Sequence, residues 1–323
     1  LADYIVVGDS RAFAEGCKVA GVSLDLPVWH PGDGDIDLSQ GAVIADLGHY
    51  EPGAVERGKA SKAGGAFALA NFRTVLRLAN RGGADAATFT PFNKNAMRLA
   101  VPPYVDEIEV ITAETGAASD GREFNILGNL WNARVTSHVP LSGVAELITK
   151  DRVLGGIRLT NESMKAAGFE KPRIAVAALN PHAGDGGNFG HEDDAEIAPA
   201  VEAAKAEGIL CDGPFPSDTV FLRAKRGDYD VVQTMYHDQG QIAMKLMGFE
   251  LGVTLIGGYG FPVCTPAHGT AYDIAGQGIA NLGATREAMR VAARMAEPKG
   301  TASSARARLL SECMATGERS AAA

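Results

Sequence analysis

Short apolar, β-rich runs alternate with longer stretches of helical periodicity along most of this chain, and this order constrains its fold more than any other feature. It is typical of stacked βα units, in which helices cover a largely parallel sheet. The predicted strands are 4–7, 43–47, 86–90, 133–137, 173–179, 229–235 and 253–256, and the predicted helices are 65–80, 193–207 and 285–296. The sequence therefore predicts an α/β fold of two lobes, with an active-site cleft between them at strand carboxyl ends.

Composition narrows the class of protein. The chain has 323 residues and a net charge of −9, with no dense run of lysine and arginine, so a nucleic-acid partner is not expected. No stretch approaches the roughly 18 consecutive apolar residues that a membrane helix needs. The cysteines form no CxxC pair, so we expect reduced thiols in a cytoplasmic protein and no cysteine-based zinc site. They are Cys17, Cys211, Cys264 and Cys313.

Three histidines, His138, His182 and His237, each follow the end of a predicted strand. Strands of one sheet end at one rim, so these residues can converge although they are far apart in the sequence. Three neutral imidazoles form a metal site with positions open for substrate. In the alternative interpretation, each histidine caps a strand or bonds a backbone carbonyl. His30, His49 and His191 lack this setting and are expected in surface or loop positions. His268 lies in a fourth polar segment, residues 267–271, within a Gly/Pro-bounded loop.

Two further features fit a small-molecule site. The glycine-rich segment 180–190 could wrap a phosphate or pyrophosphate with backbone N–H groups, although it is not the dinucleotide fingerprint and glycine loops often serve only to turn. Lys245 lies eight residues after His237 in an apolar stretch. Such a lysine either extends to solvent or directs a cation into a pocket.

Five motifs, in register along residues 4–296, resemble the 4-hydroxythreonine-4-phosphate dehydrogenase family of pyridoxal phosphate biosynthesis. Its catabolic relatives include cis-dihydrodiol carboxylate dehydrogenases. The motifs are PFNK (91–94), LNPHAGDGG (179–187), GPFPSDTVF (213–221), MYHDQG (235–240) and HGTAYDIAGQG (268–278). The resemblance implies a two-lobed isocitrate/isopropylmalate dehydrogenase-like fold rather than a Rossmann domain.

The resemblance also implies an organisation. The first lobe would comprise residues 1–105 and 275–323, and the second, residues 106–274, would hold the metal ligands and the dimer interface. The family works as a homodimer with shared active sites. Its opening Gly-Asp-Pro motif is absent here, so we expect the first lobe to lack its N-terminal strand and helix.

The family's site residues map onto this sequence by motif. The resemblance implies NAD, with NADP left open, and one divalent metal per site (zinc, cobalt, nickel, manganese or magnesium). A hydroxy acid would be oxidised and could then be decarboxylated. The implied residues are His138, His182 and His237 for the metal; Lys245 and Asp238 for catalysis; Gly187, His268 and Asp273 for the cofactor; and Lys245, Thr254, Asn93 and Lys94 for the substrate.

Three departures from the family concern the substrate. The family's Gly-His-Thr-Glu motif is replaced around 106–110, Thr254 replaces an asparagine, and Val263 or Cys264 replaces an arginine. Losing a guanidinium removes a bidentate grip on phosphate. We therefore expect a substrate other than 4-hydroxythreonine 4-phosphate, and a genuine 4-hydroxythreonine-4-phosphate dehydrogenase is the alternative. A metal-binding hydrolase, an acyltransferase or a non-catalytic binder would be alternatives of another class.

Overall fold

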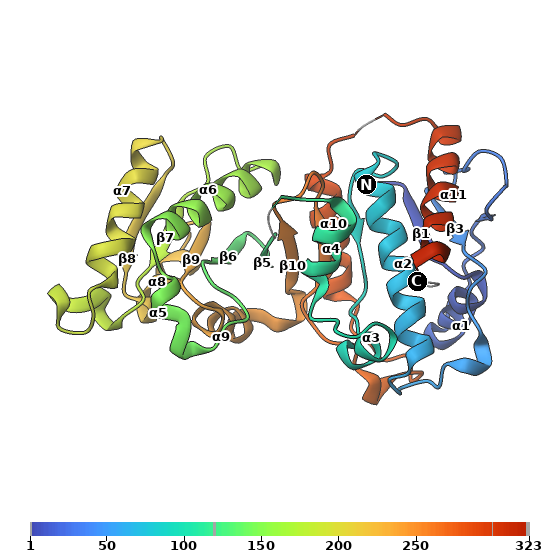
Figure 1. Ribbon diagram of the computed structural model, residues 1–323, viewed down its shortest axis with the longest axis horizontal. Helices are drawn as coiled ribbons and strands as arrows, with labels where there is room; N and C mark the ends of the chain where they lie inside the picture. Colours follow the sequence, from blue (N-terminus) through green and yellow to red (C-terminus); the bar gives the residue numbers. More distant parts are fainter. Residues whose placement is uncertain (1, 119–120, 299, 321–323) are drawn as a thin grey trace. The chain divides into compact units, whose positions relative to one another are not determined.

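The computed structural model describes residues 2–118, 121–298 and 300–320 (Figure 1). The chain divides into two compact units. Unit 1 comprises Leu1–Asp120, Tyr259–Leu282 and Ala296–Ala323, and unit 2 comprises Gly121–Gly258 and Gly283–Met295. This division differs from the expected lobes, because residues 106–120 and 259–274 group with unit 1 and residues 283–295 with unit 2.

Side-chain pairing explains the first difference. Helix α4 (Glu107–Thr115) packs against helix α2 (Lys62–Asn80) in unit 1. Glu114 of α4 accepts a hydrogen bond from Arg77 Nη2 at 3.1 Å and lies 3.1 Å from Arg73 Nε, both on α2. Helix α10 (Gly283–Met295) packs instead on strand β10 (Val253–Gly257), which places it in unit 2.

Unit 1 is built on a parallel sheet in the order β1-β3-β2. Its strands are β1 (Tyr4–Gly8), β2 (Val28–Trp29) and β3 (Ala42–Asp46), and a second parallel pair is β4 (Ala87–Thr88) with β11 (Val263–Pro266). Helix α2 contacts α3 (Lys94–Ala100), α4 and α11 (Ser303–Ser320) (Figure 1). Trp29, Val43 and Leu310 are buried in a shared core, so α11 closes one side of this sheet.

Helix α1 (Ser10–Ala20) follows β1 directly, because the chain has a strong capping residue at the junction. Asp9 accepts a hydrogen bond from Arg11 N at 3.0 Å, which satisfies one of the first unpaired N–H groups of the helix. Gly21 ends α1 in the left-handed conformation with φ of 65°.

Unit 2 contains a mixed sheet in the order β10-β5-β6-β9-β7-β8. Strands β6, β9, β7 and β8 run parallel, whereas β5 is antiparallel to both β10 and β6. The remaining bounds are β5 (Arg122–Leu127), β6 (Leu130–Arg134), β7 (Ile174–Ala177), β8 (Cys211–Phe215) and β9 (Val231–Thr234).

Helices cover both faces of this sheet. Val232 of β9 packs with α8 (Ser217–Lys225) and α9 (His237–Gly248). The next residue, Gln233, points to the opposite face, where it accepts a hydrogen bond from Thr160 of α6 (Lys150–Ala166) at 2.7 Å. Helix α7 (Ala198–Ala206) packs with α6 on that face. A short helix, α5 (Val144–Leu147), precedes α6.

Short irregular helices occupy several connections. They are η1 (Pro52–Ala54), η2 (Leu141–Gly143), η3 (Pro181–Gly187), the π-helix η4 (Asp193–Ile197), η5 (Phe249–Leu251) and η6 (Tyr272–Ile274). Among the described helices, none is long and apolar enough to cross a membrane.

Candidate active site

The three predicted metal histidines lie at one edge of the unit 2 sheet. His138 follows β6, His182 follows β7 and His237 begins α9 after β9. These three strands run parallel, so their carboxyl ends share an edge. The argument from strand ends therefore places all three residues correctly on one rim.

Two of the three histidines are neighbours. The ring centroids of His138 and His237 lie 5.8 Å apart, and Nδ1 of His237 lies 2.6 Å from Oδ1 of Asp238. This contact leaves Nε2 as the ring nitrogen of His237 for a metal, and a carboxylate behind a ligating imidazole is a common arrangement. The donor chemistry thus fits a divalent metal that prefers nitrogen.

His182 is not part of that pair. Its exposed ring lies 6.0 Å from the ring of Phe189, measured between centroids. In the part of the chain that the structure describes, no three His, Cys, Asp or Glu side chains are close enough to hold a metal ion. The structure therefore places the three histidines after the carboxyl ends of neighbouring strands and brings His138 close to His237. It does not bring all three side chains into one cluster.

The backbone around His182 has an unusual conformation. Residues 182–186 all have positive φ, including His182 (55°), Ala183 (56°) and Asp185 (46°). Non-glycine residues adopt this region at an energetic cost and persist there when neighbours hold them. A Cβ on Gly187, where φ is 93°, would lie 2.7 Å from the His191 ring. Glycine at 187 is therefore required by the packing of the turn itself.

Asp193 holds the start of this turn. Its side chain is fully buried, and its carboxylate accepts hydrogen bonds from Leu179 N at 2.8 Å and from Asn180 N at 3.1 Å. The side-chain amide of Asn180 donates to the same carboxylate at 3.0 Å. Asp193 was not predicted as a site residue, because its role depends on a contact across 14 residues that no local pattern reveals.

Arg134 supports the segment that leads to His138. The Arg134 side chain is buried, forms an ion pair with Glu123 and donates to Asn125 Oδ1 at 2.9 Å. Its Nε also donates to Ser137 Oγ at 3.2 Å, immediately before His138. A buried arginine on a strand was missed in the sequence for the same reason as Asp193.

The other unit 2 candidates differ in exposure. Lys245 is exposed on the last turn of α9, between exposed Ile242 and Leu246. Asp238 has a side chain that is 73% exposed. Thr254 is half-buried on β10 and pairs with Asn125 of β5.

The substrate candidates of unit 1 lie at the start of α3. Asn93 is the N-cap of this helix, and its Oδ1 accepts from Ala96 N at 3.0 Å. Lys94 Nζ lies 3.7 Å from Glu107 Oε2, and the Tyr104 hydroxyl donates to Glu107 Oε1 at 2.9 Å. Burial, and then the neighbouring Glu107 carboxylate, raise the pKa of Tyr104 well above its usual value. Lys94 thus faces a carboxylate from the segment that departs from the family motif.

Two residues at the position of the family's arginine lie in the core. Val263 and Cys264 have fully buried side chains on β11. Burial raises the pKa of the Cys264 thiol to about 12. Neither residue can offer a cation to a substrate.

The cofactor candidates of unit 1 follow β11. His268 Nδ1 lies 2.9 Å from the carbonyl oxygen of Gly269, while its Nε2 is buried and has no hydrogen-bond partner among the described residues. A buried polar atom without a partner is costly, and a bound ligand can satisfy it. Asp273 is exposed in η6.

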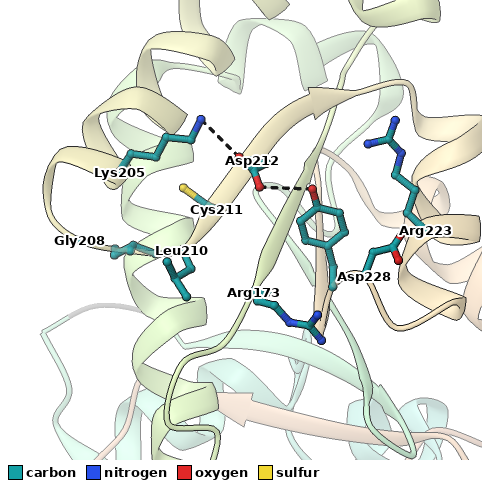
Figure 2. A pocket seen from close by; sticks show the side chains of 10 residues that line it. Arg173, Lys205, Gly208, Leu210, Cys211, Asp212, Arg223 and Asp228 are labelled. Atoms are coloured by element: carbon teal, nitrogen blue, oxygen red, sulfur yellow. Dashed lines mark hydrogen bonds and ion pairs between the residues drawn. The ribbon is translucent and has the colours of Figure 1, made fainter.

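A separate pocket of about 720 Å³ in unit 2 lies at the other edge of the sheet, near the amino-terminal ends of β7, β8 and β9. Several of its charged groups have partners. Lys205 Nζ lies 3.4 Å from Asp212 Oδ1 (Figure 2), and the Tyr229 hydroxyl donates to Asp212 Oδ2 at 3.3 Å. Arg173 is paired with Asp230 at 2.7 Å. This pocket contains no histidine and is not the candidate active site.

Comparisons with known proteins agree with the motifs. The family described as pyridoxal phosphate biosynthetic protein PdxA matches residues 1–292. A Rhizobium meliloti protein named "Putative 4-hydroxythreonine-4-phosphate dehydrogenase 2" is 55% identical over 304 residues, which cover 94% of this chain and 87% of that protein. A Symbiobacterium thermophilum protein named "Putative D-threonate 4-phosphate dehydrogenase" is 39% identical over 294 residues, which cover 90% of this chain and 87% of that protein.

Solved structures show the same fold. A 4-hydroxythreonine-4-phosphate dehydrogenase from Burkholderia phymatum superposes with a TM-score of 0.75 at 33% identity, covering 90% of this chain and 88% of that one. A terephthalate 1,2-cis-dihydrodiol dehydrogenase from Burkholderia xenovorans reaches a TM-score of 0.63 at 25% identity, covering 92% and 90%. The predicted α/β fold and family are both confirmed, and this chain belongs to the PdxA family of dehydrogenases.

Proposed function

We propose that this chain is an NAD-dependent and divalent-metal-dependent dehydrogenase that oxidises a hydroxy acid and can decarboxylate the product. Membership of the PdxA family supports the reaction class. The observation that carries the proposal for the site is the pair of neighbouring imidazoles, His138 and His237, at the carboxyl ends of parallel strands. This is the edge of a sheet where α/β enzymes usually place their chemistry.

His138, His182 and His237 would hold the metal. When bound, a divalent cation lowers the pKa of a substrate hydroxyl and favours the departure of its proton. Asp238 would orient the His237 ring through its 2.6 Å contact with Nδ1. His182 would approach from the left-handed turn that Asp193 anchors.

Gly187, His268 and Asp273 would contribute to the NAD site, and NADP is equally compatible with these residues. NAD, when bound, supplies the hydride acceptor. The unpartnered Nε2 of His268 supports a ligand at this loop. Packing against His191 already explains why residue 187 is glycine. The assignment of Gly187 to the cofactor site therefore rests on the family motif alone.

Lys245 would stabilise developing negative charge or donate the final proton. Its exposure on unit 2 is compatible with access to a substrate. Lys94 and Thr254 would contact the substrate. Asn93 would act indirectly, because its side chain caps α3 and so fixes the start of the helix that bears Lys94.

We propose a substrate other than 4-hydroxythreonine 4-phosphate. The Glu107 carboxylate beside Lys94 disfavours a phosphate at that lysine, because the two anions would repel each other. The buried Val263 and Cys264 offer no replacement for the family's arginine. The names of the 55% and 39% identical relatives favour a second candidate, a phosphorylated hydroxy acid, either 4-hydroxythreonine 4-phosphate or D-threonate 4-phosphate.

We further propose a homodimer with shared active sites. Ile242 is 60% exposed and Leu246 is 84% exposed, one turn apart on α9 and beside Lys245. Large apolar side chains exposed together on one helix face are typical of protein interfaces. A second copy covering this face would also bring its own residues close to Lys245.

A substrate panel tests the proposal. NADH or NADPH formation would be measured with 4-hydroxythreonine 4-phosphate, D-threonate 4-phosphate, unphosphorylated hydroxy acids and cis-dihydrodiol carboxylates, each with added zinc, manganese or magnesium. The account predicts turnover on a compound other than 4-hydroxythreonine 4-phosphate. Turnover on that compound alone would contradict the substrate proposal and leave the reaction class intact.

A further inference from the structure

The side chain of Gln239 bonds the ends of two neighbouring strands. Its Oε1 accepts a hydrogen bond from the backbone N–H of Met235 at 2.7 Å, at the end of β9. Its Nε2 donates to the carbonyl oxygen of Ala178 at 2.8 Å, at the end of β7. Met235 lies two residues before His237, and Ala178 lies four residues before His182. The Gln239 amide therefore connects the starts of the two segments that carry His182 and His237.

A hydroxyl from a third element completes this junction. Ser217 Oγ, at the start of α8, accepts from Gln239 Nε2 at 2.8 Å and donates to the Ala178 carbonyl at 2.7 Å. The oxygen of the Gln239 amide thus accepts one hydrogen bond, and its nitrogen donates two. Because an amide is planar and its partners lie on three elements, its position sets the spacing between β7, β9 and α8 at this edge.

The His182 turn is held from a second side as well. Asp193 binds the N–H groups of Leu179 and Asn180, while Gln239 and Ser217 bind the carbonyl of Ala178. Among the described residues, the hydrogen bonds of the Asp193 side chain go to the His182 segment alone. Gln239 differs because it belongs to α9, the helix that His237 begins.

We propose that Gln239 is a positioning residue that fixes the His182 turn relative to His237 and so prepares the metal site; this inference rests on the proposed function. Removing the amide leaves the Ala178 carbonyl with only the Ser217 hydroxyl and leaves the Met235 N–H without its acceptor. Groups that orient metal ligands typically change affinity by about 10–100-fold when they are replaced.

Gln239→Leu removes the polar atoms with little change in side-chain size and no change in charge. Gln40→Leu is the control for the loss of a glutamine amide, since Gln40 is exposed in unit 1, which contains none of the three metal histidines. Ser217→Ala should show a smaller effect in the same direction. Thr219→Ala is its control, because the Thr219 hydroxyl donates to the carbonyl oxygen of Pro216, the N-cap of α8, rather than to a histidine segment.

The readouts are cobalt(II) affinity, the visible absorption of bound cobalt(II) and the thermal unfolding midpoint of the metal-free protein. We expect Gln239→Leu to weaken cobalt(II) binding by about tenfold or more and to alter the absorption band. Gln40→Leu should leave both the affinity and the absorption band unchanged, with the affinity within twofold of the original. The absorption band reports ligand geometry, which a loss of stability alone does not change.

Two failures can be told apart. Cobalt(II) binding by Gln239→Leu with unchanged affinity and spectrum would overturn this inference while leaving the proposed function intact. If the unsubstituted chain itself binds no cobalt(II), the proposed metal site fails, and the inference fails with it.

Discussion

Nδ1 of His237 lies 2.6 Å from Oδ1 of Asp238, its neighbour on the first turn of α9. This contact selects Nε2 as the nitrogen available to a metal and holds the ring in one orientation. We expect Asp238→Asn to weaken divalent metal binding by about tenfold, because a neutral amide makes the imidazole a poorer ligand. Competition with a chromophoric chelator measures the affinity. Equal affinity in both proteins would show that the carboxylate does not act through His237.

The ion pair between Lys94 and Glu107 makes a prediction about substrate choice. Glu107→Gln removes the charge beside Lys94 while keeping an acceptor for the Tyr104 hydroxyl. We expect KM for phosphorylated hydroxy acids to fall severalfold relative to KM for unphosphorylated ones, because the lysine charge is then uncompensated. Steady-state kinetics on matched pairs of substrates gives the ratio. A ratio that stays the same or rises would remove Glu107 from the substrate argument.

Close packing at Gly240 predicts a stability effect. A Cβ at this position on α9 would lie 2.1 Å from Asn132 Oδ1, and Asn132 is itself tied to Val232 O and Thr234 Oγ1. Gly240→Ala should therefore reduce the free energy of unfolding by about 1–3 kcal/mol. Gly155→Ala on α6 is the control, since nothing lies within 4 Å of its Cβ. That variant should gain up to about 1 kcal/mol, and denaturant titration of both proteins distinguishes the two outcomes.

The pairing of Asp9 with Arg11 predicts a pH dependence. Hydrogen bonds from the Arg11 side chain, at 3.0 and 2.8 Å, hold the pKa of Asp9 at about 2, below its ordinary value of 3.8. Because the folded state favours the carboxylate, this stabilisation is present above about pH 4 and is lost as the pH falls toward 2.

Asp9→Asn isolates this effect, because asparagine still caps α1. The Arg11 side chain is half exposed, so solvent screens its ion pair with Asp9. The variant should therefore lose roughly 1 kcal/mol of unfolding free energy near neutral pH. The difference in unfolding free energy between the two proteins should shrink as the pH falls from 4 to 2 and vanish below about pH 2. A difference in unfolding free energy that does not change with pH would contradict the account.

The alternation of apolar runs was enough to predict the α/β fold. The predicted strands 4–7, 43–47 and 253–256 correspond closely to β1, β3 and β10. Strand β5 escaped prediction because Glu123 and Asn125 interrupt its apolar residues, and both serve the buried Arg134. Strand β8 escaped because its Gly213-Pro214 step is typical of a turn.

The candidate site was predictable where the signal was local. A polar residue that follows a buried strand is visible in the sequence, which is why His138, His182 and His237 were placed on one rim. The anchors of those segments were not predictable, because Asp193 and Gln239, which lie on helices, act through backbone atoms just after β7, which are distant from them in the sequence. The lobe boundaries were displaced for a similar reason, since the Arg77–Glu114 pair joins segments 37 residues apart.

Turnover during metal removal and return tests the central claim most directly. The chain would be treated with a chelator, and NADH formation from its best hydroxy-acid substrate would be followed as divalent metal is titrated back. The account predicts loss of turnover and saturable recovery, with no recovery in a variant in which His138 and His237 are both alanine. Full turnover in the chelated protein, or equal recovery in the double variant, would contradict it.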